Sequence, residues 1–252
     1  MKGSMLVYHA LNIGEEMLLC GAEIGRVEDT IARICRSYDV IRVDVFTITS
    51  TISVTAVTRD EGPVTQTRRI MGQSSDMEKL DRLNNLSRYI CQHRPESDEI
   101  ERLLREACAQ PRYCRCVWYL IYALTTSAFT CFFGGGLLDA LCAALIGCAI
   151  KAMIDLNEHM RLNRLFFTIL CSAASGALAL ALMRLGLGRS LDKIVIGDIM
   201  VLIPGLAFTN SIRDLISGDI MSGVLRIVES LLIAVCIALG FGLALGIWGG
   251  VL

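Results

Sequence analysis

A run of 23 consecutive uncharged residues, Ser230 to Leu252, constrains the fold of this chain more than any other feature. About 20 apolar residues in a helix cross a bilayer core of about 30 Å. Four further apolar runs precede it, at about 116–133, 134–150, 165–183 and 194–212. The second and fourth are shorter and each contains an aspartate, but in series with the others they predict an all-α polytopic membrane domain of about five transmembrane helices.

The charged residues are unevenly distributed along the chain. Residues 1–112 contain 15 Lys/Arg and 17 Asp/Glu, which leaves 9 and 8 for the last 140 residues. This division predicts a small α+β domain at 1–112, followed by a transmembrane helical domain at 113–252. The net charge of −1 argues against nucleic acid as a partner.

The first domain alternates helical and extended patterns. Apolar spacing predicts a helix over residues 5–37 with a bend near Gly21, and another over Met77–Gln92. Ser97 is expected to cap a further helix. Residues rich in β-branched side chains predict three strands, Ile41–Ile48, Thr51–Thr58 and Val64–Ile70.

The beginning of the chain does not resemble a secretory signal, because Asn12, Glu15 and Glu16 interrupt its apolar residues. We therefore expect a cytoplasmic N-terminal domain on a multi-pass protein of the cell (inner) membrane. The loop Lys and Arg residues favour the same orientation. The 11 cysteines are odd in number and scattered, so reduced thiols are expected.

A polar stretch, Ile199–Ser230, lies across the last two apolar runs. One charged side chain at the centre of a membrane helix costs roughly 2.5–3.5 kcal/mol. The charges are therefore expected at the membrane surface or along a polar pathway inside the protein. The predicted substrate-pathway residues are Asp198, Pro204, Gly205, Asn210, Arg213, Asp214, Asp219, Ser222, Arg226 and Glu229.

Several of these residues have structural alternatives. Pro204 and Gly205 interrupt the fourth run, either as a ligand-binding break or as a packing kink. Asp219 is also suited to capping the last helix. Arg226 could reach Asp214 or Glu229, either as a purely structural pair or as a site for a carboxylate or an amino acid. In the second case Glu229 or Asp214 would take part in proton coupling.

A second charged set lies near the N-terminus: Glu15, Glu23, Arg26, Glu28 and Asp29. A structural or gating role is favoured over a regulatory or hydrolytic site. The three histidines are isolated in the sequence, and no zinc-protease, phosphate-loop or nucleophile-elbow motif is present. The chain is therefore predicted not to be an enzyme and to need neither a metal nor a cofactor.

Two segments together resemble the threonine/serine exporter family (ThrE-like). One runs from Met200 to Asp219, with Ser-Gly-Val-Leu-Arg following at 222–226, and the other from Ile13 to Ile31. The resemblance is to the larger, YjjP-type subunit of the split form of that family. It implies secondary export of threonine and serine, or of dicarboxylates such as succinate. It also implies a smaller, all-membrane partner subunit.

Two other functions remain open at this level. The chain could be a membrane-anchored enzyme, or a sensor, whose cytoplasmic domain carries the activity. Export is preferred, because a mere anchor has no need of costly membrane charges. The expected partners are the lipid bilayer, the smaller subunit and a small-molecule amino acid or dicarboxylate, with a higher oligomer as a further option.

Overall fold

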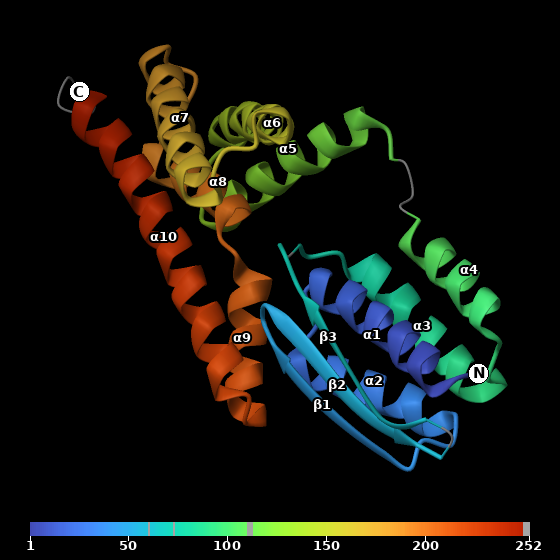
Figure 1. Cartoon of the computed structure of the whole chain (residues 1–252). Helices are drawn as coiled ribbons and strands as arrows, with labels where there is room; N and C mark the ends of the chain where they lie inside the picture. Colours follow the sequence, from blue (N-terminus) through green and yellow to red (C-terminus); the bar gives the residue numbers. More distant parts are fainter. Residues whose placement is uncertain (60, 73, 110–112, 249–252) are drawn as a thin grey trace. The chain divides into compact units, whose positions relative to one another are not determined.

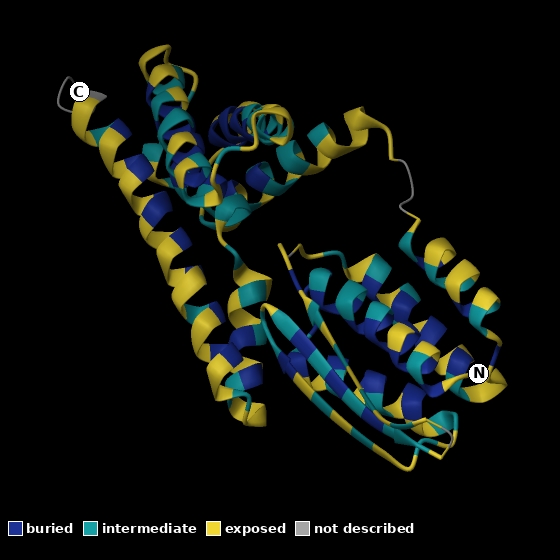
Figure 2. Cartoon of the chain, viewed as in Figure 1, coloured by how far each residue is buried: buried dark blue, intermediate teal, exposed yellow. Residues whose placement is uncertain are grey.

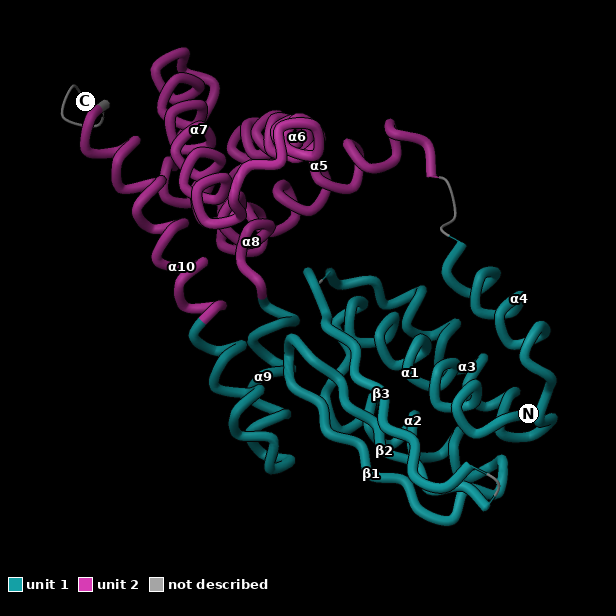
Figure 3. Tube along the Cα trace, in the orientation of Figure 1, with its two compact units in different colours: residues 1–111, 205–228 teal, residues 112–204, 229–252 magenta. Residues whose placement is uncertain are grey.

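The computed structural model describes residues 1–59, 61–72, 74–109 and 113–248 (Figure 1). It is mostly helical, with one three-stranded antiparallel sheet. The chain forms two compact units (Figure 3). The first contains Met1–Pro111 and Gly205–Val228, and the second contains Arg112–Pro204 and Glu229–Leu252. A segment from the polar stretch thus packs with the N-terminal unit.

The first unit contains helices α1 (Gly3–Leu19), α2 (Ile24–Ser37), α3 (Met77–His93), α4 (Ser97–Cys108), α9 (Gly205–Ser217) and the first residues of α10 (Ile220–Trp248). Its strands are β1 (Arg42–Ile48), β2 (Thr51–Thr58) and β3 (Gly62–Arg69). All three strands lie close to the ranges expected from the sequence. The sheet order is β1-β2-β3, with Val45 opposite Val54 and Val54 opposite Gln66.

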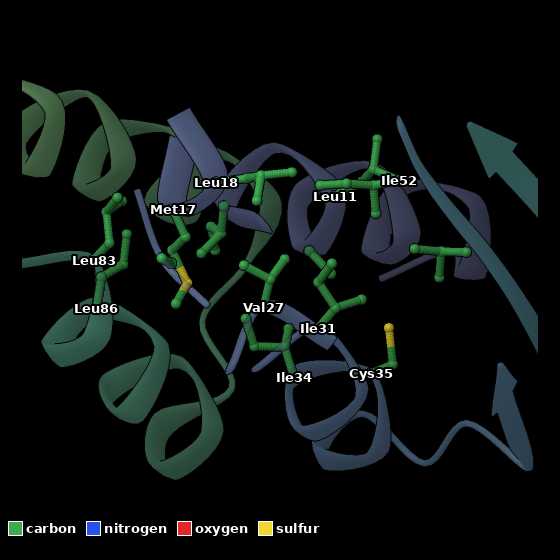
Figure 4. Packing of buried hydrophobic residues seen from close by; sticks show 14 of the residues in the cluster. Leu11, Met17, Leu18, Val27, Ile31, Ile34, Cys35, Ile52, Leu83 and Leu86 are labelled. Atoms are coloured by element: carbon green, nitrogen blue, oxygen red, sulfur yellow. The ribbon is translucent and has the colours of Figure 1, made fainter. Parts of the chain in front are cut away.

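One face of the sheet is buried because β2 alternates in polarity. Ile52, Val54 and Ala56 are fully buried, whereas the residues between them are partly exposed. Helix α1 packs against β2 and β3, and α2 packs against β1. Figure 4 shows the resulting core, in which Leu11 and Ile31 lie among side chains from both helices and the sheet. Burial of this apolar surface holds the unit together.

The helix expected over residues 5–37 is two helices, α1 and α2, joined by a turn at Cys20–Glu23. Gly21 has a φ of +88°, and a Cβ there would lie 2.9 Å from the carbonyl oxygen of Ser74. Glycine suits both demands, because it has no Cβ. The cap expected at Ser97 is also displaced: Glu96 is the N-cap, and Ser97 is the first residue of α4.

The second unit contains α5 (Arg115–Phe132), α6 (Leu137–Met160), α7 (Arg164–Arg184), α8 (Leu191–Leu202) and the rest of α10. Helix α8 packs against α5, α6 and α7. The α5–α8 contact is close, because a Cβ on Gly197 would lie 2.1 Å from the Thr130 hydroxyl oxygen. Apolar residues from these helices and α10 form the core, among them Ile146, Ile194 and Phe241.

Three of the described helices are long and apolar enough to cross a membrane: α6, α7 and Ile220–Ile247 of α10. Figure 2 shows many exposed residues along α10. They include Leu232, Val235 and Leu239, whose large apolar side chains suit contact with lipid. The fourth apolar run forms two helices, α8 and α9, because Pro204 interrupts it. The expected count of five spans therefore stays a prediction.

Candidate functional site

The polar stretch forms a tight helical hairpin. Helix α9 ends at Ser217, and α10 begins at Ile220. Between them Gly218 has a φ of +98°, a conformation that glycine adopts readily because it has no Cβ. A Cβ on Gly223 would lie 2.9 Å from the carbonyl oxygen of Ser211. This close approach brings the inner faces of α9 and α10 together within the first unit.

A buried ion pair joins the two arms of the hairpin. The Arg226 guanidinium donates from Nη1 to Oδ2 of Asp214 at 3.0 Å. The two side chains are only 2% and 1% exposed. Of the two partners that the sequence offered to Arg226, the structure selects Asp214.

The same pair also binds the turn between α1 and α2. Arg226 Nη2 donates to the carbonyl oxygen of Ala22 at 3.2 Å, and the amide of Ile24 donates to Oδ1 of Asp214 at 3.2 Å. These bonds connect residues about 200 positions apart in the sequence. We call Ala22, Ile24, Asp214 and Arg226 the hairpin node.

Two further contacts surround the hairpin node. Asn210 donates from Nδ2 to the carbonyl oxygen of Gly21 at 3.0 Å. Arg213 pairs with Glu23, which also lies 3.7 Å from Arg26. The two predicted sets, one from each end of the chain, therefore meet here. Both polar arms of the hairpin are fixed on one backbone turn of the N-terminal unit.

The remaining residues of the N-terminal set are dispersed. Glu15 pairs with Arg68 at 3.2 Å, and Asp29 pairs with Arg33 on the surface of α2. The Glu28 carboxylate accepts the amide of Thr47 at 2.7 Å, and burial raises its pKa. The five residues therefore do not form one ionic cluster: Glu23 pairs with Arg213 of the hairpin, and Arg26 lies beside Glu23.

The other predicted pathway residues lie in different surroundings. Glu229 pairs with Arg164 at 2.7 Å in an exposed position, and Ser222 is buried near the start of α10. A carboxylate oxygen of Asp219 lies 3.8 Å from the position of a Cβ on Gly25. Asp198 belongs to the second unit, where it is fully buried on α8. Pro204 follows that helix, and Gly205 begins α9.

Sequence reasoning missed a polar pair inside the first unit. His9 is 2% exposed, and its Nε2 lies 2.6 Å from the hydroxyl oxygen of Ser97. A Ser–His–acid triad needs a carboxylate on Nδ1. Within the part of the chain that the structure describes, His9 Nδ1 has no hydrogen-bond partner, so the third member is missing. The two residues are 88 positions apart, and no local motif signals their contact.

The buried imidazole predicts a dependence of stability on pH. Burial lowers the pKa of His9 from its ordinary value of 6.5, although Glu101 and Asp98 oppose the shift. Below pH 6.5 the unfolded chain therefore binds a proton that the folded chain does not. As the pH is lowered below 6.5, the free energy of unfolding should therefore decrease, by at most about 1.4 kcal/mol per pH unit.

Hydrogen exchange of the α4 amides, corrected for intrinsic rates, measures this effect at about pH 7.5 and about pH 5.5. His9→Gln should remove the loss of protection at the lower pH. His93→Gln, at an exposed histidine that ends α3, should keep it. An identical response of both variants would contradict the assignment to His9.

No group of three His, Cys, Asp or Glu side chains is arranged to hold a metal ion among the described residues. The hairpin node instead combines a guanidinium and a carboxylate. Such groups bind carboxylate and ammonium groups through charge-assisted hydrogen bonds. The arrangement therefore suits small charged or zwitterionic solutes.

Comparison with known families decides the relationship. The family described as "Putative threonine/serine exporter" (ThrE) matches residues 9–248. The chain belongs to this threonine/serine exporter family. A "Probable threonine/serine exporter" of Mycobacterium tuberculosis is 25% identical over 237 residues, which cover 93% of this chain and 45% of the relative. The chain thus spans less than half of that relative's length. No solved structure matches it.

Membership of the threonine/serine exporter family agrees with the apolar helices, and the chain is a membrane protein. The family match extends over the whole hairpin node, from Ala22 to Arg226. It also includes Asp198 and the His9–Ser97 pair. The contacts described above define the geometry of these residues.

Proposed function

We propose that this chain is a subunit of a secondary exporter of small polar metabolites, threonine and serine or dicarboxylates such as succinate. The proposal places it in the cell (inner) membrane as a multi-pass protein, with the N-terminal domain in the cytoplasm. The hairpin node is the observation that carries it. A buried, paired charge is costly to maintain, and here it lies at the beginning of a helix long enough to cross a membrane.

A smaller membrane subunit completes the exporter in this proposal. The Mycobacterium tuberculosis relative is more than twice as long as the segment it shares with this chain. The partner would supply what corresponds to the unmatched part of the relative. An odd number of spans in this chain, as predicted from the sequence, would also be consistent with a pathway built from two chains.

The hairpin node gives this exporter a closed state. Asp214 and Arg226 bind each other and the turn at Ala22 and Ile24, so neither is available to a solute. When α10 moves away from α9, Arg226 presents a planar guanidinium that binds a carboxylate in two hydrogen bonds. Asp214 then accepts from an amino group, or Arg213 takes the second carboxylate of a dicarboxylate.

Arg226→Lys tests the proposal, because lysine keeps the charge and loses the planar fork. Losing one hydrogen bond to a charged group costs about 1.5–3 kcal/mol, so export should fall roughly ten- to hundredfold. The assay is efflux of labelled threonine, serine and succinate from proteoliposomes that contain both subunits. Thermal unfolding in detergent shows whether the variant remains folded.

Arg164→Lys is the matched control, since Arg164 forms an exposed ion pair with Glu229. It should export like the native protein. Equal export by the two lysine variants would remove the hairpin node from the pathway. Absence of flux for all three solutes, with both native subunits folded, would contradict the export function itself.

A further inference from the structure

Two aspartates are buried among the helices of the second unit, and their surroundings differ. Asp139 on α6 is 1% exposed, and Asp198 on α8 is 0% exposed. Burying an ionised carboxylate without compensating partners costs several kcal/mol. The partners of each carboxylate therefore indicate its charge state.

Asp139 has the partners that an ionised carboxylate needs. Its Oδ1 accepts the amides of Arg189 at 2.6 Å and Ser190 at 3.0 Å. Its Oδ2 accepts the amide of Gly136 at 3.0 Å, at the beginning of α6. Three backbone donors, close to a helix N-terminus, stabilise the negative charge.

Asp198 has no such partners. Neither carboxylate oxygen has a hydrogen bond within the part of the chain that the structure describes. The neighbouring Gly197 packs on Thr126 and Thr130 of α5, but both hydroxyls already donate to carbonyl oxygens, those of Ala143 and Thr126. Nor does Asp198 form an ion pair with any of the described residues.

The other titratable groups around α8 are few. The elements packed against it contribute the buried Asp139 and Cys142 of α6, the buried Cys171 of α7 and the half-buried Tyr122 of α5. None of these is a cation, and the partly buried Lys151 of α6 pairs with Asp155 at 2.6 Å. The neutral carboxyl is therefore the form of Asp198 that this environment stabilises.

We propose that Asp198 is the proton-binding site of the membrane helices, neutral in the packed state seen here and ionised when α8 separates from α5. The proposal rests on the export function and names the proton as the coupling ion. On separation the carboxyl gives its proton to water in the opened path. It takes one from water on the other side before the helices pack again.

A break in the chain next to Asp198 permits this movement. Pro204 has no amide hydrogen, so the carbonyl of Met200 receives no helical bond from that position. Helix α8 ends at Leu202, and the next helix, α9, begins at Gly205. By contrast, Asp214 is held by Arg226 and the Ile24 amide, and Glu229 is exposed beside Arg164. These two carboxylates are satisfied in the packed state.

Carbodiimide labelling tests the proton site without any transport. Dicyclohexylcarbodiimide reacts with protonated carboxyl groups in apolar surroundings. The carboxyl O–H adds across a C=N bond of the reagent, and the adduct rearranges to a stable acylurea. Mass spectrometry of the purified full chain should find the adduct on Asp198, with a yield that falls as pH rises. Asp139 should remain unlabelled, and Asp198→Asn should lose the adduct. The proposal would be overturned if Asp198 remained unlabelled or if Asp139 were labelled equally. It would also be overturned if sodium ions protected Asp198 from labelling at constant pH.

Export in proteoliposomes tests the coupling. Asp198→Asn should lose the response of export to an imposed pH difference. Asp192→Asn is the matched control, because Asp192 is an exposed aspartate on the same helix, and it should respond like the native protein. A native response by Asp198→Asn would overturn the coupling. If the native pair exports nothing, the export function fails, while the labelling experiment still decides the proton site.

Discussion

Replacing Arg226 by alanine should destabilise the protein by about 3–5 kcal/mol, the range observed when one partner of a buried ion pair is removed. The change leaves the Asp214 carboxylate, 1% exposed, with the Ile24 amide as its one remaining described partner. It also removes the donor to the Ala22 carbonyl. Thermal unfolding in detergent measures the loss, which is a large fraction of the 5–15 kcal/mol typical of folded domains.

Arg164→Ala provides the comparison, because it removes the same side chain from an exposed pair with Glu229. Exposed pairs contribute about 0–1 kcal/mol, so its effect should be small. Joint replacement by Arg226→Met and Asp214→Leu should restore part of the lost stability, since no buried charge remains. The restoration stays incomplete, because Ala22 and Ile24 lose their partners. If the two alanine variants had equal stability, the ion pair would not be the source of the effect.

Gly240→Ala should weaken packing in the helical unit by about 1–3 kcal/mol, the usual cost of overfilling a close contact. A Cβ on Gly240 would lie 2.5 Å from the carbonyl oxygen of Ile169 and 2.6 Å from Cβ of Ser172. Both belong to α7, and the nearer atom is backbone, which cannot rotate away. Helices α7 and α10 must therefore separate. The midpoint of thermal unfolding in detergent should fall.

Gly242→Ala is a control on the same helix, two residues further along. A Cβ at Gly242 would have no neighbour within 4 Å, so alanine fits without displacement. Its helix propensity favours the substitution by up to about 1 kcal/mol. The two variants should therefore shift the unfolding midpoint in opposite directions. A similar midpoint for both would show that the α7–α10 contact tolerates an added methyl group.

Much of the fold could be predicted from local patterns. The β-branched runs located all three strands to within about two residues, and apolar spacing located α3. Pro204 indicated the interruption between α8 and α9. The break between α1 and α2 was underestimated as a bend, because both helices have apolar faces that continue across Gly21. The positive φ of Gly21 and the close approach of Ser74 are both visible only in the tertiary structure.

The candidate site was only partly predictable. The cost of charges in apolar helices identified Arg226 and Asp214 as unusual, and Asp214 and Glu229 were the two acids that Arg226 was expected to reach. Spacing could not select between them, because both lie within reach of a long arginine side chain. Nor could it connect Ala22 to Arg226, since a backbone carbonyl leaves no signal in the sequence.

The sequence by itself determined the division into a charged first part and an apolar second part, because bilayer thickness and the cost of buried charge act on composition directly. Tertiary structure alone decided that the hairpin Gly205–Val228 packs with the N-terminal unit, and that the Cys20–Glu23 turn completes the ion pair. It alone also distinguished Asp139 from Asp198. Two aspartates on apolar helices look alike in the sequence, and their charge states depend on which backbone amides the fold brings within hydrogen-bond distance.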